Sequence, residues 1–217
     1  MTLHLRPPLF FLAAIAALLA GCGATMPVRV LDDGESRLVA SLGGPISTSV
    51  VPTGLTPYAT LGLYHGLDST TTIGGSIHAT MLAFGVAGVD VGMAHRVLRQ
   101  EGARPELTAS IQALVFTDFH TFGSSRIWPN ASLSASWEIA GWLPYAGCHL
   151  TTQHTRFDVF VSPYVGVSVP LSARWTVQLE TIWQAANKDS RSGIFEGTTS
   201  LAGSGSLGAF LAGSMRL

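Results

Sequence analysis

The residue types that carry most enzyme chemistry are present in this sequence, but not in arrangements that the chemistry uses. A serine hydrolase needs a nucleophilic serine, a histidine base and an acid that orients the base. His120 lies near Ser124 and Ser125, but this pairing falls in a predicted loop where nothing fixes its geometry. We therefore predict no catalytic residues and a protein that is not an enzyme.

Metal and cofactor sites are not predicted either. None of the seven histidines forms a His-x-His or an i, i+4 pair, the spacings typical of metal ligands. The segment 203–208 matches G-x-G-x-x-G, but a dinucleotide site needs a helix after the motif. Only nine residues follow, and they alternate like a strand. Glycine in a closing strand explains the match better.

Six charged residues remain as candidates for a polar site, because each lies on the strand face whose alternate positions carry small polar side chains. They are Asp90, Arg96, Glu138, Asp158, Glu180 and Arg216. An isolated charge is costly to bury, so charges on an enclosed face must be paired. We predict that they form a polar network filling the interior of the fold. The alternative is a catalytic or transport set.

Composition limits the function classes. The formal net charge is -1 and only 12% of residues are charged, so no nucleic-acid partner is predicted. Hydrophobic residues make up 47% of the chain, yet after the N-terminus they are spread out among glycine, serine and threonine. This weak, interrupted hydrophobicity is typical of strands that meet lipid in a barrel.

The elements that carry these residues are strands, because apolar and small polar residues alternate with period two. Val89, Val91 and Met93, for example, alternate with Asp90 and Gly92. The pattern predicts an all-β, antiparallel up-and-down transmembrane β-barrel of about ten strands, with eight as the second choice. The expected strands are 36–48, 56–66, 71–82, 88–98, 106–116, 128–139, 142–151, 157–169, 174–185 and 204–217.

Three features favour a barrel with its apolar face outward. The other face is rich in serine, threonine and glycine, which suits a polar lumen. Tryptophans lie close to predicted strand ends, as in the aromatic girdles of membrane barrels: Trp137, Trp142, Trp175 and Trp183. Short connections at 140–141 and 170–173 contrast with long ones at 117–127 and 186–203, which predicts periplasmic turns and external loops.

The N-terminus has the pattern of an export signal. Arg6 precedes the apolar run 9–19, which is too short to be a comfortable membrane span. The following Leu19-Ala20-Gly21-Cys22 resembles the lipobox of bacterial lipoproteins. That resemblance implies a lipoprotein signal peptide over 1–21, lipidation of Cys22, an acylated tether over 22–35 and a barrel over 36–217. Gly23, rather than aspartate, suggests the outer membrane.

The segment 36–217 resembles small outer-membrane barrels of the OmpA/OmpX type, and the alternation that ends at Leu217 supports this. Family members usually end in an aromatic residue, so this terminus departs from the pattern. The resemblance implies contact with outer-membrane lipid and lipopolysaccharide, and with the barrel-assembly machinery. It names no activity and no external ligand.

Three functions follow as hypotheses. The first is a non-enzymatic outer-membrane lipoprotein with a structural or surface-interaction role through loops 117–127 and 186–203. The second is a periplasmic, lipid-anchored soluble barrel that holds an apolar ligand inside. The third is a lipid A-modifying outer-membrane enzyme; the deacylases among such barrels place histidine and serine on one strand face in the order His-x-Ser, a motif that this sequence lacks.

Overall fold

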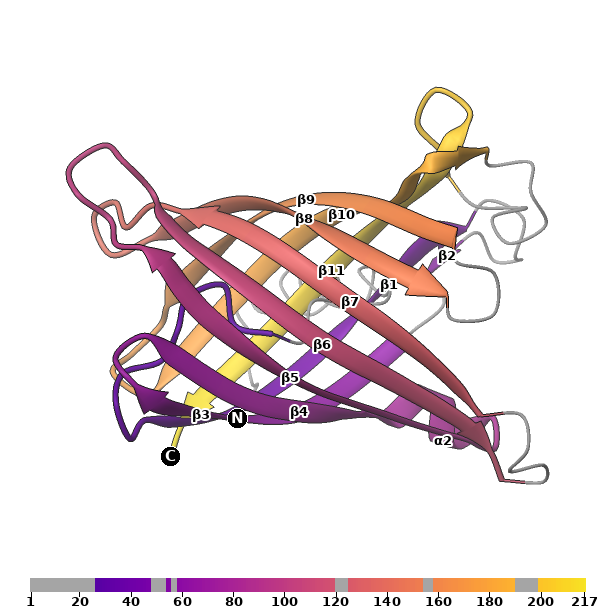
Figure 1. Cartoon of the computed structure of the whole chain (residues 1–217), viewed down its shortest axis with the longest axis horizontal. Helices are drawn as coiled ribbons and strands as arrows, with labels where there is room; N and C mark the ends of the chain where they lie inside the picture. The colour runs from indigo at the N-terminus through magenta and orange to yellow at the C-terminus, as the bar shows by residue number, and fades with distance from the viewer. Residues whose placement is uncertain (1–25, 48–53, 56–57, 120–124, 154–157, 190–198) are drawn as a thin grey trace, which may run out of the picture.

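The computed structural model describes residues 26–47, 54–55, 58–119, 125–153, 158–189 and 199–217. Within them, ten long strands form the wall of a barrel and a two-residue strand extends one edge (Figure 1). The strands are β1 (Ser36–Ser47), β2 (Gly54–Leu55), β3 (Tyr58–Asp68), β4 (Thr71–His78), β5 (Val86–Leu98), β6 (Glu106–Asp118), β7 (Arg126–Ser136), β8 (Leu143–Gln153), β9 (Asp158–Pro170), β10 (Trp175–Asp189) and β11 (Ser204–Arg216).

The wall is an antiparallel meander closed by its first and last strands. Each long strand pairs with its neighbour in the chain, except that β1 pairs with β3 because β2 is only a short addition to its edge. β1 also pairs with β11, from Arg37 opposite Arg216 to Pro45 opposite Gly208. Closure removes the exposed strand edges that an open sheet would have, which is a condition for crossing lipid. The predicted fold class and strand number are confirmed.

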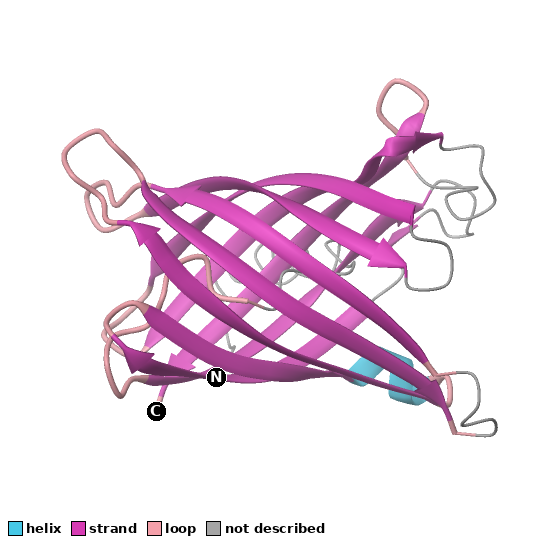
Figure 2. Ribbon diagram, in the orientation of Figure 1, coloured by secondary structure: helices cyan, strands magenta, loops and turns pink. Residues whose placement is uncertain are grey.

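The predicted strand boundaries agree closely with the structure, with one difference in kind. The expected strand 71–82 ends at His78, and the short helix α2 (Ala79–Ala83) follows it at one rim (Figure 2). The backbone N–H of Gly85 donates to the carbonyl of Leu82 at 3.1 Å, and Gly85 has φ of +75°. Glycine adopts this conformation at little cost, so the chain turns here before β5.

The two rims differ as the sequence pattern predicted. The C-terminus lies at the rim that carries the β3–β4, β5–β6, β7–β8 and β9–β10 turns (Figure 1). We call this the turn rim, and the opposite one the loop rim. Parts of the predicted external loops, 120–124 and 190–198, lie outside the described residues. Among the described residues, no helix is long and apolar enough to cross a membrane.

The apolar face of the strands points outward. Leu133 is 50% exposed, Leu179 is 44% exposed and Val91 is 61% exposed, although all three lie in the middle of wall strands. In a water-soluble barrel with an apolar interior these side chains would meet each other inside. The second hypothesis, a soluble barrel that holds an apolar ligand, therefore does not fit this structure.

Three inward-facing tyrosines each lie over a glycine on the neighbouring strand. Tyr64 is paired with Gly74, Tyr145 with Gly166, and Tyr164 with Gly147. A Cβ atom at any of these glycines would collide with the tyrosine ring or its hydroxyl. The absence of a side chain lets each ring lie flat along the wall, as in the aromatic–glycine pairs known from other sheets.

The lumen and its N-terminal plug

The inner face of the wall is built mainly from small hydroxyl side chains. The buried ones are Ser41, Thr60, Thr72, Ser76, Thr108, Ser110, Ser134, Ser136, Ser162, Ser168 and Ser206. In small barrels large side chains usually fill the interior. Small wall residues leave a space that another part of the chain must occupy.

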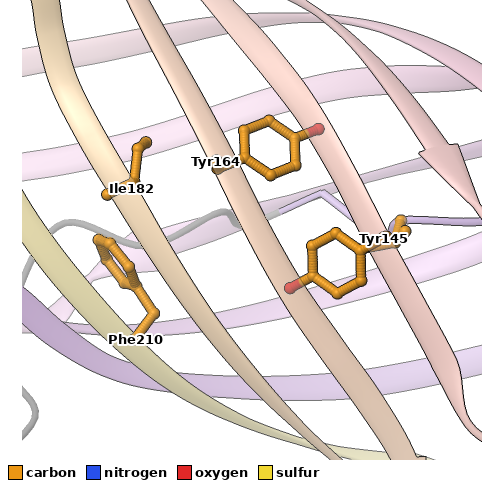
Figure 3. Packing of buried hydrophobic residues seen from close by; sticks show 5 residues of the cluster. Tyr145, Tyr164, Ile182 and Phe210 are labelled. Carbon is orange, nitrogen blue, oxygen red and sulfur yellow. The ribbon is translucent and has the colours of Figure 1, made fainter.

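Residues 26–35 occupy that space, and we call them the plug. Val28 packs inside the barrel against an aromatic and aliphatic cluster from four strands. That cluster is Tyr145, Tyr164, Ile182 and Phe210 (Figure 3). These wall residues point inward, opposite to the lipid-facing leucines, so the plug supplies the apolar partner that they need to avoid water.

A second apolar cluster holds the N-terminal end and the middle of the plug. Met26 and Leu31 are buried with Tyr64 and with Ala94, which is fully covered. Met26 lines a small internal cavity of about 10 Å³ together with Ser110 and Ser132, which lie in the middle part of β6 and β7. The plug therefore reaches from the turn rim to well inside the barrel.

Hydrogen bonds fix the position of the plug along the barrel axis. The backbone N–H of Leu31 donates to Thr72 Oγ1 at 2.7 Å, and Ser134 Oγ donates to the carbonyl of Val28 at 3.1 Å. At its base, the N–H of Gly34 donates to the carbonyl of Gly66 at 3.0 Å, and Gly66 N–H donates to the Glu35 carbonyl at 2.9 Å. These bonds satisfy backbone groups that would otherwise be buried without partners.

Arg29 joins the plug to two carboxylates and a serine at the turn rim. Its Nε donates to Ser136 Oγ at 2.9 Å and lies 3.8 Å from Glu106 Oε1, while Nη1 lies 3.4 Å from Glu138 Oε2. Nη2 also donates to Gln100. Glu106 is buried, so this cation compensates a carboxylate that would be costly to bury alone.

Glu35 at the base of the plug is buried between two arginines of the closing strands. Arg37 Nε lies 2.6 Å from Glu35 Oε1, and Arg216 Nη2 lies 3.6 Å from Glu35 Oε2. Because Arg37 and Arg216 are cross-strand partners in β1 and β11, the carboxylate separates two like charges that would otherwise repel. The plug is thus tied to the strand pair that closes the barrel.

A polar cluster centred on Asp90 lies above the plug, towards the loop rim. His78 Nε2 and Asp90 Oδ2 are 2.9 Å apart, and Gln112 Nε2 donates to Asp90 Oδ1 at 2.8 Å. Ser76 donates to the same carboxylate, and Tyr58 bonds to His78 Nδ1. The serine binds the acid rather than the histidine, so the set lacks the nucleophile–base contact of a hydrolase.

The structure brings none of the six predicted charged residues together as one set; each has its partner elsewhere. Asp90 is held as above, and Glu180, also buried, accepts from Tyr145 Oη at 2.9 Å. The pairs at the rims are Arg96 with Glu106 at 3.8 Å, Glu138 with Arg29, Asp158 with Lys188 at 3.0 Å, and Arg216 with Glu35. Glu138 is largely exposed beyond the end of β7.

The four predicted interface tryptophans lie at two heights. Trp137 and Trp142 are in the β7–β8 turn and Trp175 begins β10, so all three lie at the turn rim. Trp183 lies further along β10, and its Nε1 donates to the carbonyl of Ser204 at 2.9 Å.

Cys22, predicted as the lipidation site, lies outside the described residues.

Sequence reasoning missed the plug, because residues 22–35 were assigned to a tether. The available signal was the presence of three apolar residues, Met26, Val28 and Leu31, because a solvated tether would not need them.

No metal site is found: the described residues contain no group of three or more histidine, cysteine, aspartate or glutamate side chains able to hold an ion. A cavity of about 370 Å³ lies between the plug and the wall at the turn rim.

Comparison with known proteins gives structural relatives only. No family model and no curated protein matches the chain. The COG4313 outer membrane channel from Pseudomonas putida is 11% identical with a TM-score of 0.51, covering 90% of this chain and 100% of that one. OprG from Pseudomonas aeruginosa is 7% identical with a TM-score of 0.33, covering 88% and 99%. Outer membrane phospholipase A from Escherichia coli is 8% identical with a TM-score of 0.32, covering 86% and 94%.

The closed meander, the outward apolar face and the fold of the channel define this chain as a transmembrane β-barrel of the outer-membrane class. Within that class it is a ten-stranded barrel that holds a segment of its own chain in the lumen.

Proposed function

We propose that this chain is a non-enzymatic protein of the outer membrane that is closed by its own plug and acts through the loops of the loop rim. The observation that carries the proposal is the seating of Val28 and Arg29 inside the barrel among wall residues from strands β7 to β11. A lumen filled in this way does not offer its side chains to a substrate. Loops on a rigid scaffold are the usual place for binding.

An epitope tag on each rim tests the orientation on which this proposal depends. A tag inserted between Phe119 and Ser125 should bind antibody on intact cells, because this connection lies at the loop rim. The matched tag between Ser172 and Arg174, in the β9–β10 turn, should bind only after the outer membrane is permeabilised. The reverse labelling pattern would exclude a surface role for the loop rim.

Lipid A modification is the enzymatic alternative, and mass spectra of lipopolysaccharide decide it. We expect identical spectra from cells with and without the protein, since Ser76 binds Asp90 rather than His78. Acyl-chain loss or transfer that depends on the wild-type chain and disappears in a His78→Ala variant would show an enzyme instead.

We also propose lipidation of Cys22, which the lipobox residues support. Four residue steps separate Cys22 from Met26, a span of roughly 14 Å at most. Met26 lines a cavity inside the barrel together with Ser110. Mass spectrometry of the N-terminal peptide should find Cys22 acylated, and Cys22→Ala should remain in the membrane through its strands. An unmodified peptide that begins elsewhere would refute the lipid anchor.

A further inference from the structure

We propose that the plug is releasable, and that the barrel conducts small hydrophilic solutes once residues 26–33 leave the lumen. This goes beyond the proposed function, which requires only that the lumen is closed in the state described. The proposal depends on three properties of the plug: how it is attached, what holds it, and what it covers.

The plug is attached differently from every wall strand. Neighbouring strands exchange backbone hydrogen bonds along their whole length, such as the register from Glu106 opposite Ser136 to Phe116 opposite Arg126. Residues 26–33 instead meet the wall through side chains and single bonds, at Val28 and Leu31. Removal of the plug therefore breaks no strand pairing, and the barrel stays closed without it.

Two glycines lie at the base of the plug: Gly34 is a hinge in the chain, and Gly66 of β3 makes a close contact with the plug. Gly34 has φ of +73°, a conformation that glycine adopts freely. A Cβ atom at Gly66 would collide with the carbonyl oxygen of Asp32. The plug can sit against β3 only because position 66 has no side chain, so Gly66→Ala pushes it out of place from outside the plug itself.

Arg29 holds the plug in place at the turn rim. It joins the plug to β6 through Glu106, to β7 through Ser136 and to the β7–β8 turn through Glu138. Charge-assisted bonds of this kind are stronger than neutral ones, and a buried carboxylate favours the state that keeps its cation near. Loss of the guanidinium therefore shifts the equilibrium towards the released state.

The surface that the plug covers is partly polar. Ser110, Ser132 and Ser134 line the space beside Met26 and Val28, and Glu180 faces the same space. Hydroxyl and carboxylate groups hydrate readily, so water and small hydrophilic solutes can replace the plug there. Release also uncovers the apolar cluster against which Val28 packs, and this cost keeps the wild-type plug seated for most of the time. The open cavity at the turn rim, beside Arg29, is the entrance to this path.

Planar-bilayer conductance in KCl tests the proposal with the full chain. We expect wild type to be closed for most of the recording, and Arg29→Ala and Gly66→Ala each to raise the open fraction at least about tenfold, the factor expected when charged hydrogen bonds or a packing fit are lost. Arg104→Ala is the matched control, because among the described residues the ion pair of this rim arginine is with Glu101 of its own turn, at 2.8 Å. It should conduct like wild type.

Thiol labelling gives a second readout that does not depend on conductance. In a background that carries both Cys22→Ala and Cys148→Ala, Ser110→Cys places a thiol beneath the plug, and a water-soluble maleimide should label it slowly until Arg29→Ala is added. Heat-modifiable gel mobility checks that each variant forms a closed barrel. If folded Arg29→Ala and Gly66→Ala variants match wild type in both conductance and labelling, the plug is not releasable and the proposal is overturned.

Discussion

At the scale of single residues, the carboxylate of Asp90 is buried in the lumen and surrounded by hydrogen-bond partners from the wall. Asp90 is 1% exposed and is bonded by three side chains, Ser76 and His78 of β4 and Gln112 of β6. Ser76 lies directly opposite Asp90, and Gln112 lies two residues away from the position in β6 that is opposite Asp90. The cluster therefore stabilises a particular strand register as well as a charge.

Replacement of Asp90 by alanine tests this role. The change leaves His78, Ser76 and Gln112 without their shared acceptor in a buried site, and we expect a loss of about 3 kcal/mol in unfolding free energy. Asp158→Ala is the control, since its pair with Lys188 is partly exposed and should be worth less than about 1 kcal/mol. Urea unfolding in lipid vesicles measures both, and equal losses would argue against a special role for Asp90.

At the scale of elements, glycine determines where the inner aromatic residues can lie. Tyr145 and Tyr164 come from adjacent strands β8 and β9, and each covers a glycine of the other strand. Their rings meet at a centroid distance of 6.1 Å and form the pocket for Val28. The fit of the plug thus depends on two strand positions that bear no side chain.

Gly166→Ala should disturb this arrangement. The new methyl group would collide with the Tyr145 hydroxyl and approach the backbone of Leu179, so we expect a loss of about 1–3 kcal/mol from overpacking. Gly213→Ala provides the control, because a Cβ atom there has no neighbour within 4 Å. The midpoint of thermal loss of the compact gel form compares the two, and a Gly213 variant that is equally unstable would contradict the packing argument.

At the scale of the whole molecule, the outward apolar band defines the environment of the barrel. Side chains such as Leu133 are half exposed in the isolated chain, and a bilayer would cover them. The loop-rim residue Leu201 has a similar exposure of 42% but lies outside the wall strands. The two leucines therefore distinguish exposure to lipid from exposure to water.

A charge at each position separates these environments. Leu133→Arg should lower the unfolding free energy in vesicles by about 2–4 kcal/mol, because a charge at mid-strand enters the hydrocarbon. Leu201→Arg should change it by less than about 0.5 kcal/mol, as for an ordinary surface position. Equal tolerance at both positions would mean that the wall does not meet lipid.

The sequence by itself determined the class of fold and the strands, because alternation with period two is a local property of each segment. Alternation does not say which face is the outer one, so the tryptophan positions and loop lengths only favoured an outward apolar face, and the structure decided it. It also located the turns, since connections such as 140–141 interrupt that alternation. The tertiary structure alone decided the partners of the charged residues and the position of residues 26–35. Arg29 meets Glu106 and Ser136 only after the wall has closed, and contacts between residues so distant in the chain leave no periodic signal in the sequence.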